Sequence, residues 1–495
     1  MAHVVHNAVV EEAGNQFARA LDQAGVAVRD TVVALLANTP EFYAVYRGTT
    51  WSGRRLTPLS WRWTADEARY VVENAEARAL VADARFGELA RDIAGSVPER
   101  ARFSVGGEIA GFRRFEEIEA QARDPYPKPL AGDIMLYTSG TTGRPKGVKR
   151  PFPEQQPPPP MVGRMGKQMI ETFTPDQEGQ GPHLVCCPLY HVAPVTYSEG
   201  ALLLGADVVL METFDAEEFL RLVEFHRVTS TFLVPTQFVR LLRLPRKTRE
   251  RYDVSSLKLV MHGAAPVSVS VKEQMIEWLG PVLFEFYGGT EGGGVMIDSH
   301  NWLLHRGSVG RPRPGLAIHI LDDEGRPVPV GTAGAVYFEG EEAPFEYKDD
   351  PEKTALARRG NYYTLGDIGR LDEDGYLYLL DRRADIIISG GVNIYPAEIE
   401  SALLELPFVA DCCVVGIPNE EWGEEVRAVV EIDPAHEVAD DAIGEAIIAF
   451  CREKLAGYQV PRGVDVVASL PRTEAGKLAR RTVREPYWEG RDRRI

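Results

Sequence analysis

The stretch from residue 137 to 147 reads Tyr137-Thr138-Ser139-Gly140-Thr141-Thr142-Gly143-Arg144-Pro145-Lys146-Gly147. It combines three glycines, four aliphatic hydroxyl side chains and one lysine directly after the apolar residues 134–136. Glycine lets backbone N–H groups approach an anion, the hydroxyls add donors, and Lys146 adds a mobile positive charge. The segment therefore predicts a polyphosphate-binding loop. A plain Gly-Ser linker is the alternative, but such linkers rarely carry this order of residues. It is not a P-loop, because no Gly-Lys-Ser/Thr closes it.

The bulk composition describes a multidomain globular protein with an acidic surface. A chain of 495 residues exceeds what one hydrophobic core usually organises, and 44% hydrophobic content is ordinary for such proteins. The formal net charge of −18 repels nucleic acid and anionic membranes in general. Phosphate ligands must therefore be drawn by local basic or N–H-rich sites, and we expect no nucleic-acid partner.

The cysteines and the N-terminus favour a reduced, cytoplasmic location. The five cysteines form no Cys-x-x-Cys or Cys/His cluster, so a zinc site is disfavoured, and Cys412-Cys413 lies in what reads as a buried strand. The N-terminus lacks the charged start and apolar core of a signal peptide. The most apolar run, residues 201–211, is short and contains Asp207, so no membrane span is expected.

Helical and strand patterns alternate through the first 300 residues, which favours doubly wound α/β layers with parallel strands. The capping-box pattern Thr64-x-x-Glu67 opens one helix. The expected helix and strand pairs are residues 64–72 with 79–82, 214–225 with 230–234, and 272–279 with 282–284. Between residues 308 and 375, short alternating segments separated by Gly and Pro indicate a β-barrel-like part.

Two segments read as loops. Residues 150–160 carry four consecutive prolines and cannot continue a helix or a central strand, so they predict an extended surface excursion. This excursion is either a lid over a pocket or, more simply, a linker. Residues 381–384 separate the barrel-like part from a compact βαβ-rich tail and mark the best domain boundary.

Five further motifs occur in order and, with the glycine-hydroxyl loop, resemble those of the adenylate-forming superfamily. This superfamily includes acyl-CoA synthetases, firefly luciferase and the adenylation domains of peptide synthetases. The motifs are residues 263–266 (Gly-Ala-Ala-Pro), 287–291 (Tyr-Gly-Gly-Thr-Glu), 363–367 (Tyr-Thr-Leu-Gly-Asp), 390–400 and 470–477. The resemblance implies a large N-terminal adenylation domain (1–381) of doubly wound α/β layers plus a β-barrel-like subdomain. A hinge (382–384) and a small mobile C-terminal α/β domain (385–495) would follow.

The resemblance also implies a two-step reaction that uses ATP, Mg²⁺ and coenzyme A. A carboxylate would attack the α-phosphorus of ATP to give acyl-AMP and pyrophosphate, and a thiol would then displace AMP. Since the first step brings two anions together, the site must supply cations and N–H donors. The expected substrate is a small carboxylic acid, fatty or aromatic.

The same resemblance assigns roles to the nucleotide-binding residues. The loop would hold the β- and γ-phosphates, Tyr287 would stack on adenine, Thr290 would contact the α-phosphate, and Glu291 would bind Mg²⁺. Asp367 would accept both ribose hydroxyls, and Arg382 would lie near the ribose and phosphate. The complete set expected to bind cofactors is Thr138, Ser139, Gly140, Thr141, Thr142, Gly143, Lys146, Gly263, Ala264, Ala265, Glu285, Tyr287, Gly288, Gly289, Thr290, Asp367, Arg382 and Gly391.

Three residues are expected to act in catalysis: Lys477, His191 and Lys146. Lys477 would bridge the substrate carboxylate and the α-phosphate, a role that suits a point charge on a flexible stem. His191 matches a family position beside the acyl carboxylate. Gly391 belongs to a glycine pair that would line the tunnel for the pantetheine arm. The acyl pocket would draw on residues 192–195, 234–236 and 292–295.

Two departures from the family pattern leave alternatives open. Ala384 replaces the Asp or Lys that assists domain rotation, so an acceptor other than coenzyme A stays open: a carrier protein, an amine, or nitrite activation as in diazotases. A catalytically silent nucleotide-binding protein is the rival of another class. The family's strands before the first helix, expected here near Glu11, are missing, so either one sheet edge is bare or the given start is late. The identity of the acid cannot be read, and a homodimer stays open.

Overall fold

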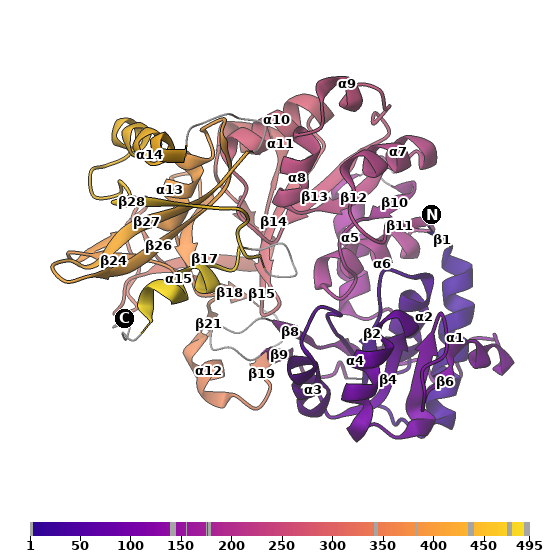
Figure 1. Cartoon of the computed structure of the whole chain (residues 1–495). Coiled ribbons are helices and arrows are strands. Elements are labelled where there is room, and N and C mark those ends of the chain that lie inside the picture. Colours follow the sequence, from indigo (N-terminus) through magenta and orange to yellow (C-terminus); the bar gives the residue numbers. More distant parts are fainter. Residues whose placement is uncertain are drawn as a thin grey trace.

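The computed structural model describes residues 3–138, 145–154, 156–174, 176, 180–340, 345–382, 384–433, 440–472 and 478–489. Figure 1 shows two adjoining α/β layers, a β-rich part beside them, and a C-terminal part drawn in orange to yellow. The predicted α/β class, with a large N-terminal portion and a smaller C-terminal one, is confirmed. None of the helices described there is both long enough and apolar enough to cross a bilayer.

The first layer is a six-stranded sheet in which all neighbouring strands are parallel. The predicted capping box is present at Thr64, whose hydroxyl accepts from the Glu67 N–H while the Glu67 carboxylate accepts from the Thr64 N–H. Strand β2 is buried along its whole length because helices cover both faces of a parallel sheet. In sheet order the strands are β6 (Arg113–Arg114), β5 (Arg102–Val105), β4 (Ala77–Asp83), β2 (Thr31–Leu35), β3 (Arg55–Pro58) and β7 (Asp133–Ile134), and the helices are α1 (Asn7–Gln23), α2 (Pro40–Thr50), α3 (Ala65–Asn74) and α4 (Gly87–Ile93).

The second layer is an eight-stranded sheet with a parallel centre and antiparallel edges. In sheet order its strands are β1 (His3–Val5), β11 (Val208–Leu210), β10 (His183–Val185), β12 (Ser230–Leu233), β13 (Leu259–Gly263), β14 (Leu283–Gly289), β15 (Gly292–Asp298) and β16 (Arg311–Pro312). Its helices are α5 (Met161–Phe173), α6 (Val192–Leu203), α7 (Ala216–His226), α8 (Pro235–Leu242), α9 (Arg246–Arg249), α10 (Val269–Leu279) and α11 (Ser299–Leu304).

The N-terminal segment corrects one expectation. The first helix begins at Asn7 rather than near Glu11, and residues 3–5 form β1, which pairs with β11 at the edge of the eight-stranded sheet. The edge at β11 is therefore covered. His6, which follows β1, hydrogen-bonds Asp207 at 2.6 Å and fixes the chain there.

The two α/β layers share one apolar core, which contains buried residues from β2 and β4 of the first sheet and from β10, β12 and β13 of the second. An ion pair crosses this core from α2 to α6: Arg47 Nε lies 2.9 Å from Glu199 Oε1, and both side chains are almost fully buried. The layers therefore form a single rigid support for the loops at their carboxyl edges.

The predicted barrel-like part is an antiparallel sheet of six strands beside a small three-stranded sheet. Its strands are β17 (Leu316–Leu321), β18 (Gly334–Gly340), β20 (Arg358–Arg359), β21 (Tyr362–Tyr363), β22 (Asp367–Leu371) and β23 (Leu377–Arg382). The small sheet comprises β8 (Leu136–Thr138), β9 (Lys146–Lys149) and β19 (Glu346–Tyr347), and helix α12 (Pro351–Leu356) follows it.

The C-terminal part has its own apolar cores, which consist of residues from Ile387 to Tyr487. Its strands are β24 (Ile387–Ser389), β25 (Val392–Ile394), β26 (Val409–Asn419), β27 (Gly423–Ile432) and β28 (Gly463–Val467), with helices α13 (Pro396–Leu403), α14 (Asp440–Lys454) and α15 (Arg480–Arg484). Most pairs are antiparallel, and only β27–α14–β28 is a parallel crossover among the described strands. The expectation of a tail rich in βαβ units was therefore wrong, because the described part contains one such unit. Cys412 and Cys413 lie in buried strand β26 as predicted.

The proline-rich segment has no helix or strand in its described residues, as predicted. It is tied to the first layer: the Gln156 carbonyl accepts from the Ala131 N–H, and the Arg55 guanidinium lies 4.2 Å from the centre of the Phe152 ring. These contacts favour the linker interpretation over the lid.

Candidate active site

The predicted phosphate loop joins two paired strands. Thr138 ends β8, Lys146 begins β9, and the two residues are cross-strand partners. The loop is therefore the connection of a β-hairpin. Five of its predicted binding residues lie outside the described residues: Ser139, Gly140, Thr141, Thr142 and Gly143.

Lys146 and the predicted metal ligand Glu291 meet at Tyr347 of β19. The Lys146 ammonium lies 5.7 Å from the centre of the Tyr347 ring, and the Tyr347 hydroxyl donates to Glu291 Oε1 at 2.8 Å. Burial, and then the neighbouring ammonium of Lys353, lower the pKa of Lys146. Lys146 and the Glu291 carboxylate therefore both contact Tyr347, with a second cation, Lys353, close to Lys146 and paired with Asp350 at 2.9 Å, and this arrangement suits a polyanion with an attached cation.

Gly263 ends β13, and Ala264 and Ala265 follow it at the carboxyl edge of the second sheet. A Cβ at Gly263 would collide with the carbonyl oxygen of Phe286 on the neighbouring strand, so the close approach requires glycine. Ala264 has a φ of 69°, a left-handed conformation that is strained for a residue with a side chain. Such strain is typical of ligand-binding turns, and Ala265 follows directly at the same edge.

Tyr287 and Asp367 are brought together from β14 and β22. The Tyr287 hydroxyl donates to Asp367 Oδ2 at 2.5 Å, and burial followed by the Asp367 carboxylate raises the pKa of Tyr287 well above its usual range. Arg382 is the cross-strand partner of Asp367, with Nε 3.6 Å from Oδ1. The predicted adenine, ribose and phosphate contacts thus form one continuous cluster of side chains.

The turn between β14 and β15 carries the remaining predicted residues of this motif. The pairing register shifts between Tyr287 and Gly288; Gly288 and Gly289 then pair with β15, and Thr290 and Glu291 form the turn. A Cβ at Gly289 would lie 2.9 Å from Glu291 Oε2 and 3.2 Å from Leu365, just ahead of Asp367. The turn therefore links the Lys146–Glu291 group to the Tyr287–Asp367 group.

His191 precedes α6 and occupies its N-cap position, with its ring 4.5 Å from that of Tyr190. The ranges expected to line the acyl pocket fall on three separate elements: the start of α6, the start of α8 and the start of β15. All three starts lie close to the carboxyl edge of the second sheet.

Of the two residues predicted to act from the C-terminal part, only Gly391 is among the described residues. Gly391 follows β24 at an exposed turn, with a φ of 79°, and nothing would contact a Cβ there within 4 Å. Lys477 lies outside the described residues; the flanking residues Arg472 and Leu478 form an antiparallel bridge. Of the three residues predicted to form the hinge, Arg383 also lies outside the described residues, whereas Arg382 and Ala384 are described.

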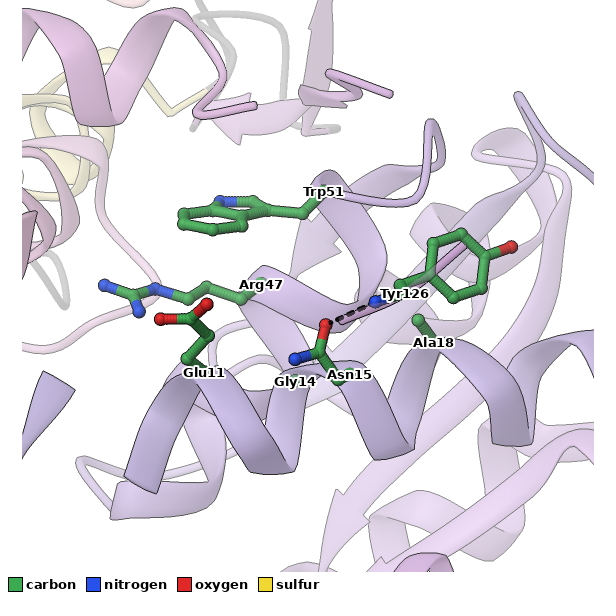
Figure 2. A pocket seen from close by; sticks show the side chains of 7 residues that line it. All are labelled: Glu11, Gly14, Asn15, Ala18, Arg47, Trp51 and Tyr126. Atoms are coloured by element: carbon green, nitrogen blue, oxygen red, sulfur yellow. Dashed lines mark hydrogen bonds between the residues drawn. The ribbon is translucent and has the colours of Figure 1, made fainter. Parts of the chain in front are cut away.

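Figure 2 shows a small pocket elsewhere, between α1 and α2, lined by Glu11, Gly14, Asn15, Ala18, Arg47, Trp51 and Tyr126. Its volume of about 10 Å³ holds no more than one water molecule. Neither Nη atom of Arg47 has a hydrogen-bond partner among the described residues, and the guanidinium lies 4.8 Å from the Trp51 ring centre. This pocket is too small for a nucleotide and includes none of the predicted site residues.

Sequence reasoning missed Tyr347 and Lys353. Tyr347 lies on β19 and Lys353 on α12, which follows β19 in the chain. The pairing of β19 with β9 brings these two elements to the site. The signal available in the sequence was the mixed segment 347–354, which carries a tyrosine and two lysines within eight residues.

Comparison with known proteins defines the class. The AMP-binding enzyme family model matches residues 8–343, and the model of the AMP-binding enzyme C-terminal domain matches residues 398–477. The chain belongs to the AMP-binding enzymes of the adenylate-forming superfamily.

Individual relatives differ in the acceptor that their names imply. The chain is 31% identical to medium/long-chain-fatty-acid–CoA ligase FadD8 of Mycobacterium tuberculosis, over 97% of this chain and 85% of that protein. It is 30% identical to fatty acid–[acyl-carrier-protein] ligase ScoC of Streptomyces coeruleorubidus, over 97% and 91%. The solved structure of amide bond synthetase McbA from Marinactinospora thermotolerans superposes with a TM-score of 0.82 at 29% identity, over 97% and 94%.

Proposed function

We propose that this protein is an ATP-dependent carboxylate–CoA ligase that activates a fatty or aromatic acid as acyl-AMP. The observation that carries the proposal is the convergence of two groups on the β14–β15 turn. Lys146 and Glu291 meet at Tyr347, while Tyr287, Asp367 and Arg382 form the adjoining cluster. Family membership supports the same chemistry.

In the proposed first step, an acid oxygen forms a bond to the α-phosphorus and the bond to pyrophosphate breaks. Lys146 would stabilise charge on the departing pyrophosphate, as a cation placed where negative charge develops. Asp367 would accept the ribose hydroxyls, held in place by the Tyr287 hydroxyl. Thr290 would contact the α-phosphate, His191 would lie beside the acid, and Lys477 would bridge the acid and the α-phosphate.

The residues around Glu291 fit a magnesium ion held mainly by phosphate oxygens. Oε1 accepts from Tyr347, whereas Oε2 has no hydrogen-bond partner among the described residues. Those residues include no group of three or more His, Cys, Asp or Glu side chains that could hold a metal by themselves. A single carboxylate oxygen is a suitable ligand for an ion that keeps its waters and bridges phosphates. When bound, the ion would neutralise phosphate charge.

The proposed second step transfers the acyl group to the thiol of coenzyme A. The thiol loses its proton to water as its sulfur forms a bond to the acyl carbon, and AMP leaves with the electrons of the broken C–O bond. Support comes from the place of Gly391 in the motif of residues 390–400 and from the relatives named as CoA ligases. We also propose residues 382–384 as the hinge, because the apolar cores of the C-terminal part begin only at Ile387.

A second candidate keeps the first step and changes the acceptor to a carrier protein, an amine or nitrite. Ala384, in the place of a hinge Asp or Lys, favours it, as do relatives named as a carrier-protein ligase and an amide bond synthetase. Pyrophosphate release measured against a panel of fatty and aromatic acids, with and without coenzyme A, separates the two. CoA-dependent thioester supports the first candidate. Acid-dependent pyrophosphate release without thioester supports the second. Nucleotide binding with no pyrophosphate release would contradict both.

A further inference from the structure

Three ionisable side chains lie together inside the apolar core behind β13 and β14. Lys272 of α10 and His262 of β13 are 0% exposed, and Glu285 of β14 is 6% exposed. Lys272 Nζ lies 2.5 Å from Glu285 Oε2, and His262 is the cross-strand partner of Glu285, with Nε2 3.9 Å from the same oxygen. Lys272 thus holds the carboxylate through Oε2, and the His262 ring lies beside the same oxygen without a hydrogen bond to it.

The surroundings of this triad are apolar. The Lys272 ammonium lies 4.8 Å from the Trp302 ring centre, and the Phe238 ring packs edge-on against His262 at 5.1 Å. Burial lowers the pKa of Lys272, and the Glu285 carboxylate opposes that shift. Burial, with the charge of Lys272, also lowers the pKa of His262 far below its usual range, so the imidazole is neutral.

Stability alone does not account for a buried ion pair of this kind. Removing two charges from water is costly, and apolar residues of similar volume often replace such pairs without loss of stability. Both ring nitrogens of His262 also lack a hydrogen-bond partner among the described residues, which adds a further cost. The triad therefore points to a positional role for the one member that keeps some exposed area.

That member is Glu285, which lies in the candidate nucleotide site. It precedes Phe286, whose carbonyl oxygen lies against Gly263, and it lies two residues before Tyr287 on the same strand. Oε2 is engaged by Lys272, whereas Oε1 has no hydrogen-bond partner among the described residues. With one oxygen fixed, the carboxylate offers the other as an acceptor in a defined place.

We infer that Lys272 is a positioning residue that holds Glu285 as the acceptor for the exocyclic amine of adenine and so sets the base preference. This inference rests on the proposed function. An ionised carboxylate only accepts hydrogen bonds, so it pairs with the 6-amino group of adenine and opposes the 6-oxo group of hypoxanthine. Lys272 acts through Glu285 and does not itself contact the base.

The test measures dissociation constants of ATP, ITP and purine riboside triphosphate, which lacks the 6-substituent. We expect wild type to bind ATP roughly tenfold or more tightly than either analogue, as for a hydrogen bond to a charged group. Lys272→Met should reduce both ratios to within about threefold while leaving the affinity for purine riboside triphosphate unchanged. Glu285→Gln should bind ITP as well as ATP, because an amide can donate to the 6-oxo group.

Two further variants keep the test decisive. The double variant Lys272→Met, Glu285→Gln leaves no charge in this core and replaces either single variant that fails to fold. Arg47→Met breaks an equally buried ion pair in the other core and should keep the wild-type ratio of ATP to ITP affinity. An unchanged ratio in Lys272→Met or in the double variant would overturn the inference and leave the proposed function standing. Wild type that binds none of the three nucleotides would overturn both.

Discussion

The hydroxyl of Tyr287 donates a hydrogen bond of 2.5 Å to Asp367, across the junction of the eight-stranded sheet and the barrel-like part. Tyr287 belongs to the sheet with the Gly-Ala-Ala turn, and Asp367 belongs to the strand that leads, through β23, toward the C-terminal part. This bond joins the residues proposed to contact adenine and ribose and fixes one oxygen of the Asp367 carboxylate.

Asp367→Asn tests the ribose contact. Replacing the carboxylate by an amide removes one charged acceptor, so we expect the KM for ATP to rise roughly tenfold to a hundredfold. The penalty should shrink when 2′-deoxy-ATP is the substrate, because one of the two hydroxyl donors is then absent. Tyr287→Phe, which keeps the ring and the carboxylate, should have the smaller effect. Acid-dependent ATP–pyrophosphate exchange measures all of these values. Equal penalties on ATP and 2′-deoxy-ATP would contradict the assignment.

Lys477→Ala tests the proposed bridge between acid and α-phosphate. We expect acyl-AMP formation to fall roughly a hundredfold to a thousandfold, because a charge aimed at the developing transition state is removed. Thioester formation from supplied acyl-AMP should persist. Arg481→Ala, which removes a nearby exposed cation paired with Glu485, should leave both steps near wild type. Equal loss of both half-reactions in Lys477→Ala would count against the role.

Gly391→Leu tests the proposed pantetheine tunnel. We expect the first step to continue and the second to fall by about a hundredfold, because the side chain would fill the space needed for the arm. The φ of 79° adds local strain for any residue with a Cβ. Gly375 has the same φ of 79° and equally open surroundings in the barrel-like part, so Gly375→Leu controls for that strain. Selective loss of the first step would rule the tunnel role out.

Arg47→Met tests the ion pair that crosses the two α/β layers. Glu199 would then lie in the core without its 2.9 Å partner, and we expect unfolding to become easier by about 3 to 5 kcal/mol. Replacing both residues, as in Arg47→Met with Glu199→Leu, should recover most of that loss. Denaturant unfolding of the α/β layers measures the difference. A single variant as stable as wild type would show that the pair contributes little.

The buried carboxyl group of Asp381, next to the proposed hinge, should make the free energy of unfolding depend on pH. It accepts from the Ala397 N–H at 3.0 Å, and burial raises its pKa to about 6, against the opposing charge of Arg480. A carboxyl with a raised pKa stabilises the folded state most below its unfolded pKa, and that contribution is lost as pH rises through about 6. The stability of wild type relative to Asp381→Asn should therefore fall between pH 5 and 7, by at most about 1.4 kcal/mol per pH unit. Denaturant unfolding at pH 5, 6 and 7 checks this, and a flat difference would contradict it.

Much of the fold could be read from local pattern. The Thr64 capping box, the helix expected over residues 272–279 and the apolar strands expected over 79–82 and 230–234 depend on local sequence, and each is present. The sequence did not predict strand β1, because three residues are too few to show an alternating pattern and its partner β11 lies about two hundred residues further along the chain.

The motifs of the site could be predicted from the sequence, but the side-chain contacts between distant segments could not. Gly263, Tyr287, Glu291 and Asp367 stand in recognisable sequence contexts, yet the partners that fix them come from elsewhere in the chain. Tyr347 reaches Glu291 only because β19 pairs with β9. Lys272 read as an ordinary helix residue, since nothing local reveals that its helix turns it inward toward Glu285. Long-range packing decides these contacts, and one sequence does not display it.

The most direct test of the account is acid-dependent exchange of labelled pyrophosphate into ATP, with the acyl-AMP product identified by mass spectrometry. We predict exchange that requires both ATP and one of the fatty or aromatic acids, together with an acyl-AMP of matching mass. Cleavage of ATP to ADP and phosphate, or pyrophosphate release that ignores every acid offered, would contradict it.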